Sequence, residues 1–502
     1  MAFDNPQSRN EALLQNILGA ANTYGIPQSR IEAILQNMLG EDNELVPPQS
    51  RNEELLLRIL AMWKSGQQAA AATDGVSLID GMGGTIAHYT KDEFLALDAL
   101  PAVPPRDRLV GQGWNWDIDD AKSYVRDYGM LIIGAQYTTA SGKTEITVEL
   151  QEGRLSPCIG LGVNGTIKID WGDGSDEEEL TGTSTATTVF SQIHNYTEPG
   201  TYVIAIDVPE GTEAAIKGAT AATGDYIGSF LLAKTQAAAT TDADAAENQV
   251  YLSSIKTVNV GNGISIANGA FRRCARLSAI TIPADVTRIG TYAFNNASSL
   301  PAITIPSGVT SIEDATFGYC YALQAVAIPA SVTTIGINVF YACTTLEAAT
   351  IPAGVTSTGT YMFYNCRRLS AITIPADVTN INTFTFNNNL SLTAVEIPAS
   401  TTSIGQSAFS GCRALSAITI PAGVENIRTN AFNGCYGVKV FTLLPTEPPA
   451  LANANAFANI AADARIVVPW SEDHSILAAY QGADNWSELA AIIVEAPEPS
   501  NG

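Results

Sequence analysis

The sequence predicts a mainly β, multidomain protein with short N-terminal helices, a central β-sandwich and a C-terminal repeat solenoid closed by a cap. Three observations lead to this fold class. Phenylalanine recurs every 23 residues through much of the C-terminal half, which is typical of a stacked repeat architecture. Short strand-like runs separated by turns rich in Gly and Asp fill residues 145–208, and a 21-residue repeat opens the chain.

Length, charge and hydropathy bound the possible functions. The 502-residue chain exceeds one ordinary domain, so several units are expected. Its net charge of −24 argues against nucleic acid and against an anionic membrane surface, because binding to either depends on clustered Lys and Arg. No apolar run approaches the ~20 residues that span a bilayer, so no membrane insertion is expected. Residues 1–9 lack the basic and apolar pattern of a signal peptide, which predicts a protein made in the cytosol.

Two residue types define the C-terminal repeat. Phenylalanine and an Ile-Pro pair recur with the same 23-residue interval, and neither series misses a step. The phenylalanines are Phe271, Phe294, Phe317, Phe340, Phe363, Phe386, Phe409 and Phe432. The prolines are Pro283, Pro306, Pro329, Pro352, Pro375, Pro398 and Pro421.

Each repeat is interpreted as one coil of a solenoid. Leucine and two isoleucines alternate with Ala and Thr in a half-buried strand, and proline ends it because proline cannot donate to a ladder. The turn Phe-x-x-Cys-x-x-Leu places its three apolar side chains on one side, so the coils must stack to bury them. Six of the seven cysteines share this turn position, with Ala297 and Asn389 in the other two repeats. Their spacing fits neither disulfides nor zinc ligands, so we expect buried unpaired thiols and no metal.

The repeat unit Leu-x-x-Ile-x-Ile-Pro-x-x-Val-x-x-Ile-Gly-x-x-Ala-Phe-x-x-Cys resembles the BspA-like leucine-rich repeats of bacterial and phage surface proteins, from about Ile255 to Val440. The resemblance implies recognition of proteins or glycans, without catalysis or cofactors. Residues 467–469, 479–480 and 485–486 resemble the segment that caps such solenoids. The coil in which Asn389 replaces Cys is predicted to pack less well, and Thr358 replaces the usual Ile.

The middle domain carries a second resemblance. Residues 171–175 (Trp-Gly-Asp-Gly-Ser), 194–196 (His-Asn-Tyr) and 199–202 (Pro-Gly-Thr-Tyr) resemble the signature of a PKD domain, an immunoglobulin-like β-sandwich that acts as a spacer in surface proteins. The glycines of residues 160–165 fit a dinucleotide-binding pattern but lead into a strand, whereas a phosphate site needs a helix there. The nearby carboxylates do not form a calcium loop and are interpreted as turn residues. His194 is interpreted as a packed residue, not a catalytic base.

A 21-residue repeat of Pro-Gln-Ser-Arg opens the chain. Each Ser is followed three residues later by Glu, a capping box before an apolar run, which predicts three short helices. Such helices are too short to persist alone, so they either pack on each other or dock on equivalent sites of a larger assembly. The repeats resemble N-terminal segments of phage virion proteins from gut Firmicutes. The anchor residues that this implies are Ser8, Arg9, Glu11, Ser29, Arg30, Glu32, Ser50, Arg51 and Glu53.

A small shoulder domain follows the anchor. It contains Trp114, Trp116 and a predicted helix near Ile118–Arg126. The tryptophans form either a carbohydrate platform or a contact with the sandwich, and packing is favoured. The predicted order is an anchor at 1–68, linker and shoulder at 69–140, a PKD-like sandwich at 141–254, a solenoid at 255–440 and a cap at 441–502.

The two faces of the predicted solenoid differ in composition. Its strand face carries outward Ala and Thr, which offer little anchoring area, whereas its turns carry Tyr and Arg, which dominate interface hot spots. Residues 258–440 hold nine Lys or Arg against seven Asp or Glu, so this region is nearly neutral in an acidic chain. The turns are either a recognition surface or an ordinary solvated face. The predicted binding residues are Arg272, Arg273, Arg276, Tyr319, Tyr321, Tyr341, Tyr364, Arg367, Arg368, Arg413 and Tyr436.

These observations favour a structural protein of a phage virion. It would be a tail or head fibre, assembled in the host cytoplasm, anchored to other virion proteins through residues 1–60 and binding a host surface protein or glycan through the solenoid. A homo-oligomer is expected, with a trimer as one candidate state. The alternatives are a bacterial cell-surface adhesin and a fibre-borne glycan-cleaving enzyme. The enzyme would need two converging carboxylates, and the sequence singles out no such pair.

Overall fold

The computed structural model describes residues 75–220, 226–234 and 251–498. They belong to the second of two compact units of the chain, Ala72–Gly502. The three predicted N-terminal helices and the predicted anchor residues, from Ser8 to Glu53, lie outside the described residues.

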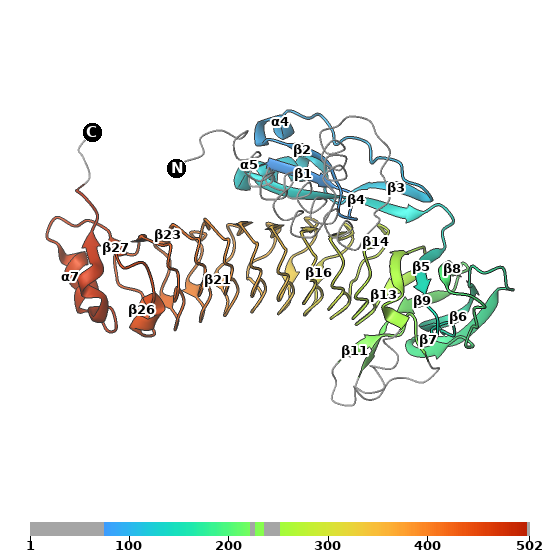
Figure 1. Ribbon diagram of the computed structural model, residues 1–502. Helices are drawn as coiled ribbons and strands as arrows, with labels where there is room; N and C mark the ends of the chain where they lie inside the picture. The colour runs from blue at the N-terminus through green and yellow to red at the C-terminus, as the bar shows by residue number, and fades with distance from the viewer. Residues whose placement is uncertain (1–74, 221–225, 235–250, 499–502) are drawn as a thin grey trace, which may run out of the picture. The chain divides into compact units, whose positions relative to one another are not determined.

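A row of stacked coils forms the C-terminal part of this unit (Figure 1). Parallel pairing joins residues that are equivalent in the repeat, such as Ala302 with Ala325 and Ile404 with Ile427. The register predicted from the repeat is therefore confirmed. Strands of the first position are β12 (Ile255–Asn259), β14 (Ala279–Thr281), β15 (Ala302–Thr304), β17 (Ala325–Ala327), β19 (Ala348–Thr350), β20 (Ala371–Thr373), β23 (Ala417–Ile420) and β25 (Val440–Leu443). Strands of the second position are β13 (Ile264–Ile266), β16 (Ser311–Ile312), β18 (Thr334–Ile335), β21 (Asn380–Ile381), β22 (Ser403–Ile404), β24 (Asn426–Ile427) and β26 (Ala450–Leu451).

The repeated phenylalanines form the core of the stack. All eight side chains, from Phe271 to Phe432, are fully buried. Neighbouring rings are nearly parallel, with centroids 5.1 to 5.6 Å apart. Each ring thus packs against the rings of the coils on either side, which confirms the predicted ladder.

The cysteine ladder adds hydrogen bonds to this core. The seven cysteines are unpaired and buried, as predicted for the ladder positions. The Cys343 Sγ donates to the backbone oxygen of Phe317 at 3.1 Å, and equivalent bonds recur in other coils. Burial raises the pKa of the Cys320 thiol to about 12, so the neutral thiol is the stable form. Asn389 breaks the pattern, because its buried amide has no hydrogen-bond partner among the described residues.

Two residues in most coils adopt the left-handed backbone conformation and shape the turns. One lies two residues before the phenylalanine, such as Tyr361 at φ 56°, and the other directly precedes the cysteine position, such as Asn365 at φ 60°. Gly and Asn tolerate this conformation best, which explains why Gly411 and Gly434 recur there.

The middle region is continuous with the solenoid. Its strands are β5 (Thr144–Leu150), β6 (Gly160–Asp170), β7 (Glu178–Phe190), β8 (Gly200–Asp207) and β9 (Glu213–Ile216), with a separate hairpin of β10 (Gly218–Thr220) and β11 (Tyr226–Ser229). A single eight-stranded sheet runs in the order β13-β9-β6-β8-β5-β12-β14, with β7 beside β6. The predicted immunoglobulin-like sandwich of two stacked sheets is therefore not confirmed. One hydrophobic core extends from Ile146 to Ile493, because this sheet covers the open end of the first coil.

The residues that resemble a PKD signature form one cluster in this region. Trp171 is buried, and the His194 ring stacks on it at a centroid distance of 4.6 Å. The His194 Nε2 lies 2.8 Å from an oxygen of Asp173, and the Tyr196 hydroxyl donates to the Trp171 backbone oxygen. The Asp170 carboxylate accepts a backbone N–H of the turn, in agreement with the turn interpretation. His194 is a packed residue, as the sequence predicts.

Residues 75–139 form a small domain that we call the covering domain. Its sheet has the order β2-β1-β4-β3, and α4 and α5 pack on one face through Phe94, Tyr124 and Val125. The predicted helix near Ile118–Arg126 is present as α5, between an Asp117 N-cap and a left-handed Gly129. The elements are β1 (Gly75–Ile79), β2 (Thr85–Tyr89), α4 (Lys91–Leu95), β3 (Leu109–Trp114), α5 (Ile118–Tyr128) and β4 (Met130–Thr139).

The C-terminal segment closes the last coil. The buried Trp486 indole donates to the Pro449 oxygen at 2.7 Å, and the Tyr480 hydroxyl donates to the Pro445 oxygen at 2.9 Å. The Phe457 ring continues the phenylalanine stack, 5.4 Å from Phe432. The elements of this segment are η1 (Ala454–Phe457), β27 (Arg465–Val468), α7 (Ser475–Gly482), η2 (Ser487–Ile492) and β28 (Ile493–Glu495).

Candidate functional site

The protein itself covers the part of the strand face that spans β15, β17 and β19. Met130 and Ile132 of β4, together with Ile79 of β1, pack against Ala302, Ala327 and Ala348. The expectation that the Ala and Thr residues of this face point into solvent is therefore wrong for the first coils, where Thr281, Thr304 and Thr350 are also buried. The small side chains let two sheets approach closely. A Cβ at Gly134 would lie 2.3 Å from the Thr304 hydroxyl.

Hydrogen bonds fix the covering domain in place. The Asn115 amide donates to the backbone oxygens of Ile305 and Ala327, at 3.2 and 3.0 Å. The Trp116 indole donates to the Ile328 oxygen at 2.8 Å. Trp116 is therefore a packed residue, as favoured, but it packs on the solenoid and not on the middle domain, because the Ile328 backbone carbonyl there accepts its N–H. Trp114 is half-buried and donates to Pro101, so neither ring forms an open carbohydrate platform.

The turn surface, in contrast, carries a contiguous group of aromatic side chains, which we call the aromatic cluster. Tyr341 is its centre, with ring centroids 5.2 Å from Tyr319 and 4.7 Å from Tyr364. Burial and the neighbouring tyrosines raise the pKa of Tyr341. Tyr319 and Tyr321 are 41 % and 44 % exposed, so the cluster reaches solvent at that end. Four predicted residues, Tyr319, Tyr321, Tyr341 and Tyr364, are thus brought together.

Sequence reasoning missed two members of the aromatic cluster. The rings of Tyr361 and Phe384 stack on each other at 4.7 Å, and Tyr361 also contacts Tyr364 at 5.6 Å. Both residues lie two positions before a ladder phenylalanine, in the left-handed conformation. Their 23-residue separation was a usable signal, because equivalent positions on neighbouring coils are adjacent in space.

Three aromatic residues of the cluster occupy backbone positions that disfavour them. Tyr319, Tyr361 and Phe384 have φ of 63°, 56° and 56°. A bulky residue in this conformation costs about 1–2 kcal/mol, whereas Gly or Asn costs less. The position of Tyr361 and Phe384 holds Asn in two other coils, and the position of Tyr319 holds Asn in three: Asn338 and Asn430, and Asn296, Asn365 and Asn388. Strain of this kind needs support from the surrounding structure, which the stacked coils provide, and it is common at functional sites.

The predicted arginines fall into different environments. Arg276 forms a salt bridge with Glu149 of β5 at 2.7 Å and so joins the solenoid to the middle region. The Arg272 guanidinium lies 5.0 Å from the Tyr292 ring centroid, and the neighbouring Arg273 is half-buried. Arg368 lies 3.6 Å from Glu347, and burial raises the pKa of that carboxyl. Arg272, Arg276 and Arg368 therefore already contact other side chains of the protein, and Arg273 is partly buried.

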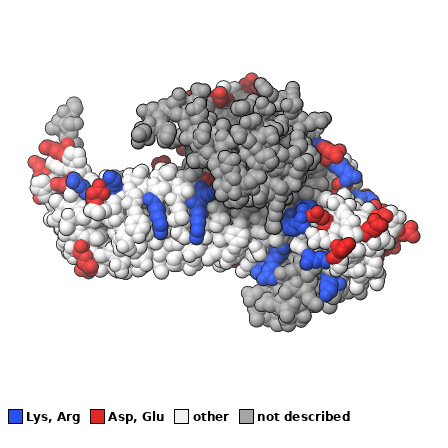
Figure 2. Space-filling view, in the orientation of Figure 1, with Lys and Arg blue, Asp and Glu red and all other residues white. Residues whose placement is uncertain are grey.

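Arg367, Arg413 and Tyr436 are exposed on the turns of later coils. The Arg367 Nε donates to Asn365 at 2.9 Å, and the Arg413 guanidinium lies 5.6 Å from the Tyr436 ring centroid. Figure 2 shows a solenoid surface that is largely uncharged where it is visible, with basic residues standing singly. The turn surface is thus aromatic and weakly basic.

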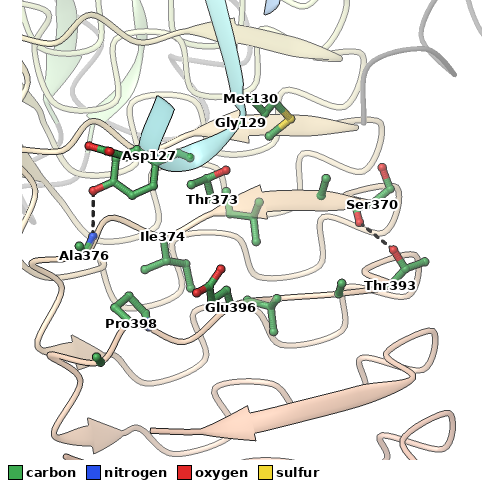
Figure 3. Close-up of a pocket in the computed structure, with 16 residues that line it drawn as sticks. Asp127, Gly129, Met130, Ser370, Thr373, Ile374, Ala376, Thr393, Glu396 and Pro398 are labelled. Atoms are coloured by element: carbon green, nitrogen blue, oxygen red, sulfur yellow. Dashed lines mark hydrogen bonds between the residues drawn. The ribbon is translucent and has the colours of Figure 1, made fainter. Parts of the chain in front are cut away.

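A pocket of about 700 Å³ opens where the covering domain ends on the strand face. Figure 3 shows Asp127, Gly129 and Met130 on one side, with Thr373 and Glu396 on the solenoid side. The Tyr128 hydroxyl, which also lines the pocket, accepts the Ala376 backbone N–H at 3.1 Å. Asp127 and Glu396 are both exposed carboxylates.

Two further properties concern the described residues as a whole. They include no group of three or more His, Cys, Asp and Glu side chains that could hold a metal ion. Every helix among them is too short or too polar to cross a lipid bilayer.

Comparison with known proteins assigns the repeat region. Residues 264–393 and 379–462 match the BspA type leucine-rich repeat region, in six copies. Residues 264–462 are therefore similar to BspA-type leucine-rich repeats, as the sequence resemblance predicts. The sequence matches no curated protein. The PKD-like identity of the middle region and the origin of the N-terminal repeats stay predictions.

Solved structures similar to this chain are also leucine-rich repeat proteins. One from Bacteroides ovatus is 21 % identical over 48 % of this chain and 70 % of its own, with a TM-score of 0.35. One from T. pallidum is 28 % identical over 31 % and 74 %, with a TM-score of 0.29. A leucine-rich cell surface protein from Faecalibacterium prausnitzii is 24 % identical over 45 % and 81 %, with a TM-score of 0.24.

Proposed function

We propose that this protein is a non-enzymatic recognition protein that binds a ligand on a cell surface through the turn surface of its solenoid. The observation that carries the proposal is the aromatic cluster around Tyr341, which lies on a rigid ladder of stacked coils. Tyrosine provides a large contact area at low entropic cost, and a rigid scaffold lowers the ordering cost of binding further. The strain at Tyr319 and Tyr361 supports a role beyond folding.

The position of the covering domain supports the choice of the turn surface. The coils of β15, β17 and β19 present their strand face to Ile79, Met130 and Ile132, so a large ligand has no access to this part of the face. The turns have no such cover among the described residues, and their most exposed aromatic side chains are those of Tyr436 and Tyr321. Among the described residues, none has to move before a ligand can reach the turns.

The N-terminal repeats are the basis for proposing the particle to which this recognition protein belongs. Their resemblance to phage virion segments favours a tail or head fibre that is anchored through residues 1–60, forms a homo-oligomer and assembles in the host cytoplasm. The alternative is that the protein is an adhesin on the surface of a cell. Deleting residues 1–60 separates the two: the fibre hypothesis predicts loss of incorporation into particles, and normal incorporation contradicts it.

The experiment for the turn surface measures binding of labelled full-length protein to intact cells of a panel of gut Firmicutes. The variant Tyr321→Ser/Tyr364→Ser should lower the apparent affinity by about 5- to 150-fold, the range of 1–3 kcal/mol expected for hot-spot side chains. The matched control is Thr419→Ala, an exposed substitution on the free part of the strand face, which should bind normally. If the tyrosine variant binds cells with wild-type affinity, the ligand does not bind at the turn surface.

Glycan cleavage is a second candidate function, because Asp127 and Glu396 line one pocket. A glycosidase needs one carboxyl group in a desolvated environment that keeps it protonated, whereas both of these are exposed. The pair Asp127→Asn/Glu396→Gln tests this function directly. Release of reducing sugar from cell-wall glycans by the natural protein, and its loss in this variant, would replace our proposal with an enzyme.

A further inference from the structure

One residue per coil follows the cysteine position and forms a row along the turns, which we call the turn row. The row begins at Tyr321. Large exposed side chains alternate with half-buried ones as far as Arg413, and the exposed Tyr436 follows directly on the next coil. Thr344 and Leu390 are half-buried, and the other members are exposed. The turn row consists of Tyr321, Thr344, Arg367, Leu390, Arg413 and Tyr436.

The two arginines of the turn row are positioned but not neutralised. Arg276 and Arg368 pair with Glu149 and Glu347, whereas Arg367 and Arg413 have no carboxylate within ion-pair distance among the described residues. Arg367 is held by Asn365, and Arg413 lies over the Tyr436 ring. Two fixed cations on the surface of a chain with net charge −24 indicate an anionic ligand.

The spacing of the arginines points to a polymer. They lie two coils apart, and the phenylalanine rings of those coils, from Phe363 through Phe386 to Phe409, are separated by 5.6 and 5.3 Å. An extended chain of pyranose sugars advances by about the same step per sugar. A linear polysaccharide that runs along the solenoid would therefore place every second sugar beside an arginine.

The neighbours of the turn row fit sugar hydroxyls. The Asn388 side-chain amide donates to Asn365 at 3.0 Å and so links the coil of Arg367 to the next coil, while Asn387 and Ser410 hold the neighbouring turn positions. Amide groups can donate and accept at once, as vicinal hydroxyls require. Tyr321 and Tyr436 supply exposed ring surface at the two ends.

We propose that the turn row binds a linear anionic polysaccharide along the solenoid axis, with carboxylates on alternate sugars that pair with Arg367 and Arg413. This inference rests on the proposed function, because it names the ligand class of the same turn surface. A guanidinium binds a carboxylate through two parallel hydrogen bonds, so the two arginines would fix the register of the polymer on the solenoid. The side-chain amides and the tyrosine rings would add to the binding affinity.

The test uses the full-length protein and two polymers with a carboxylate on every second sugar, hyaluronan and unsulfated chondroitin. Each is compared with its carboxyl-reduced form, which keeps the sugar chain and loses the charge. The variant is Arg367→Gln/Arg413→Gln. The control is Arg428→Gln/Lys439→Gln, which removes the same charge from exposed positions outside the turn row.

We expect binding of at least one polymer, and a loss of tenfold or more both for its carboxyl-reduced form and for the arginine variant. The salt dependence of binding should become shallower in that variant, since fewer counterions are released. The control should keep wild-type affinity. Absence of binding to both polymers, equal binding of the reduced forms, or an equal loss in the control overturns the inference. If cell binding still depends on Tyr321 and Tyr364 in that case, the proposed function stands with a different ligand.

Discussion

The strand face and the turn surface of the solenoid are built from the same repeat but have opposite environments. On the strand face, Ala327 is fully buried beneath Met130 and Ile132. On the turns, Tyr321 of the same coil is 44 % exposed. The small residues of the strand face, which resemble an empty binding surface in the sequence, are the contact surface for another domain of the chain. A repeat face made of Ala and Thr can therefore be a closely packed interface as readily as an exposed surface.

A charge placed on the covered part of the strand face should have the largest effect on stability. Ala327, Glu396 and Thr419 occupy the same repeat position, and the glutamate is natural in the coil where that position is exposed. Ala327→Glu should lower the free energy of unfolding by about 3 kcal/mol or more, because it buries an unpaired charge beneath the covering domain. Urea unfolding measures the change. Thr419→Glu should cost less than about 0.5 kcal/mol. Equal losses in the two variants would mean that the cover does not protect this face.

The ladder beneath both faces predicts a stabilising change. Asn389→Cys should raise the free energy of unfolding by about 1–3 kcal/mol, because it removes a buried amide without partners and restores the thiol of the other coils. The urea midpoint measures it. Ala297→Cys at the equivalent position removes no unsatisfied group, so its gain should be smaller. A loss of stability in Asn389→Cys would indicate that the amide is satisfied in solution.

The smallest expected effect comes from backbone strain at the turn surface. Tyr361 has a left-handed backbone, whereas Tyr364, in contact with it, does not. Tyr361→Asn should therefore cost about 1 kcal/mol less stability than Tyr364→Asn, because strain is relieved at only one site. Thermal unfolding gives the difference, and both variants should lose cell binding. An equal stability cost would remove strain as an argument for function.

Some of the candidate site was accessible from the sequence. The exposure of Tyr321, Arg367 and Arg413 follows from the repeat, since positions between the inward Phe, Cys and Leu must point outward. The ring contacts of Tyr361 and Phe384 were missed because their position was given no role. The salt bridge of Arg276 with Glu149 joins two regions 127 residues apart, which no local pattern predicts.

The sequence by itself determined the coil, its register, the buried phenylalanine ladder and the unpaired cysteines. Each follows from a 23-residue period in which neighbouring coils place identical residues in contact. Only the tertiary structure decided which face of the solenoid is free. Trp116 donates to Ile328 across 212 residues of sequence. The continuous apolar run Met130–Ile133, a sign of a strand buried on both faces, indicates that β4 needs a partner without saying which surface supplies it. β4 packs on the strand face because Gly134 and the small residues of that face allow a close approach. This fit in shape exists only once both surfaces have folded.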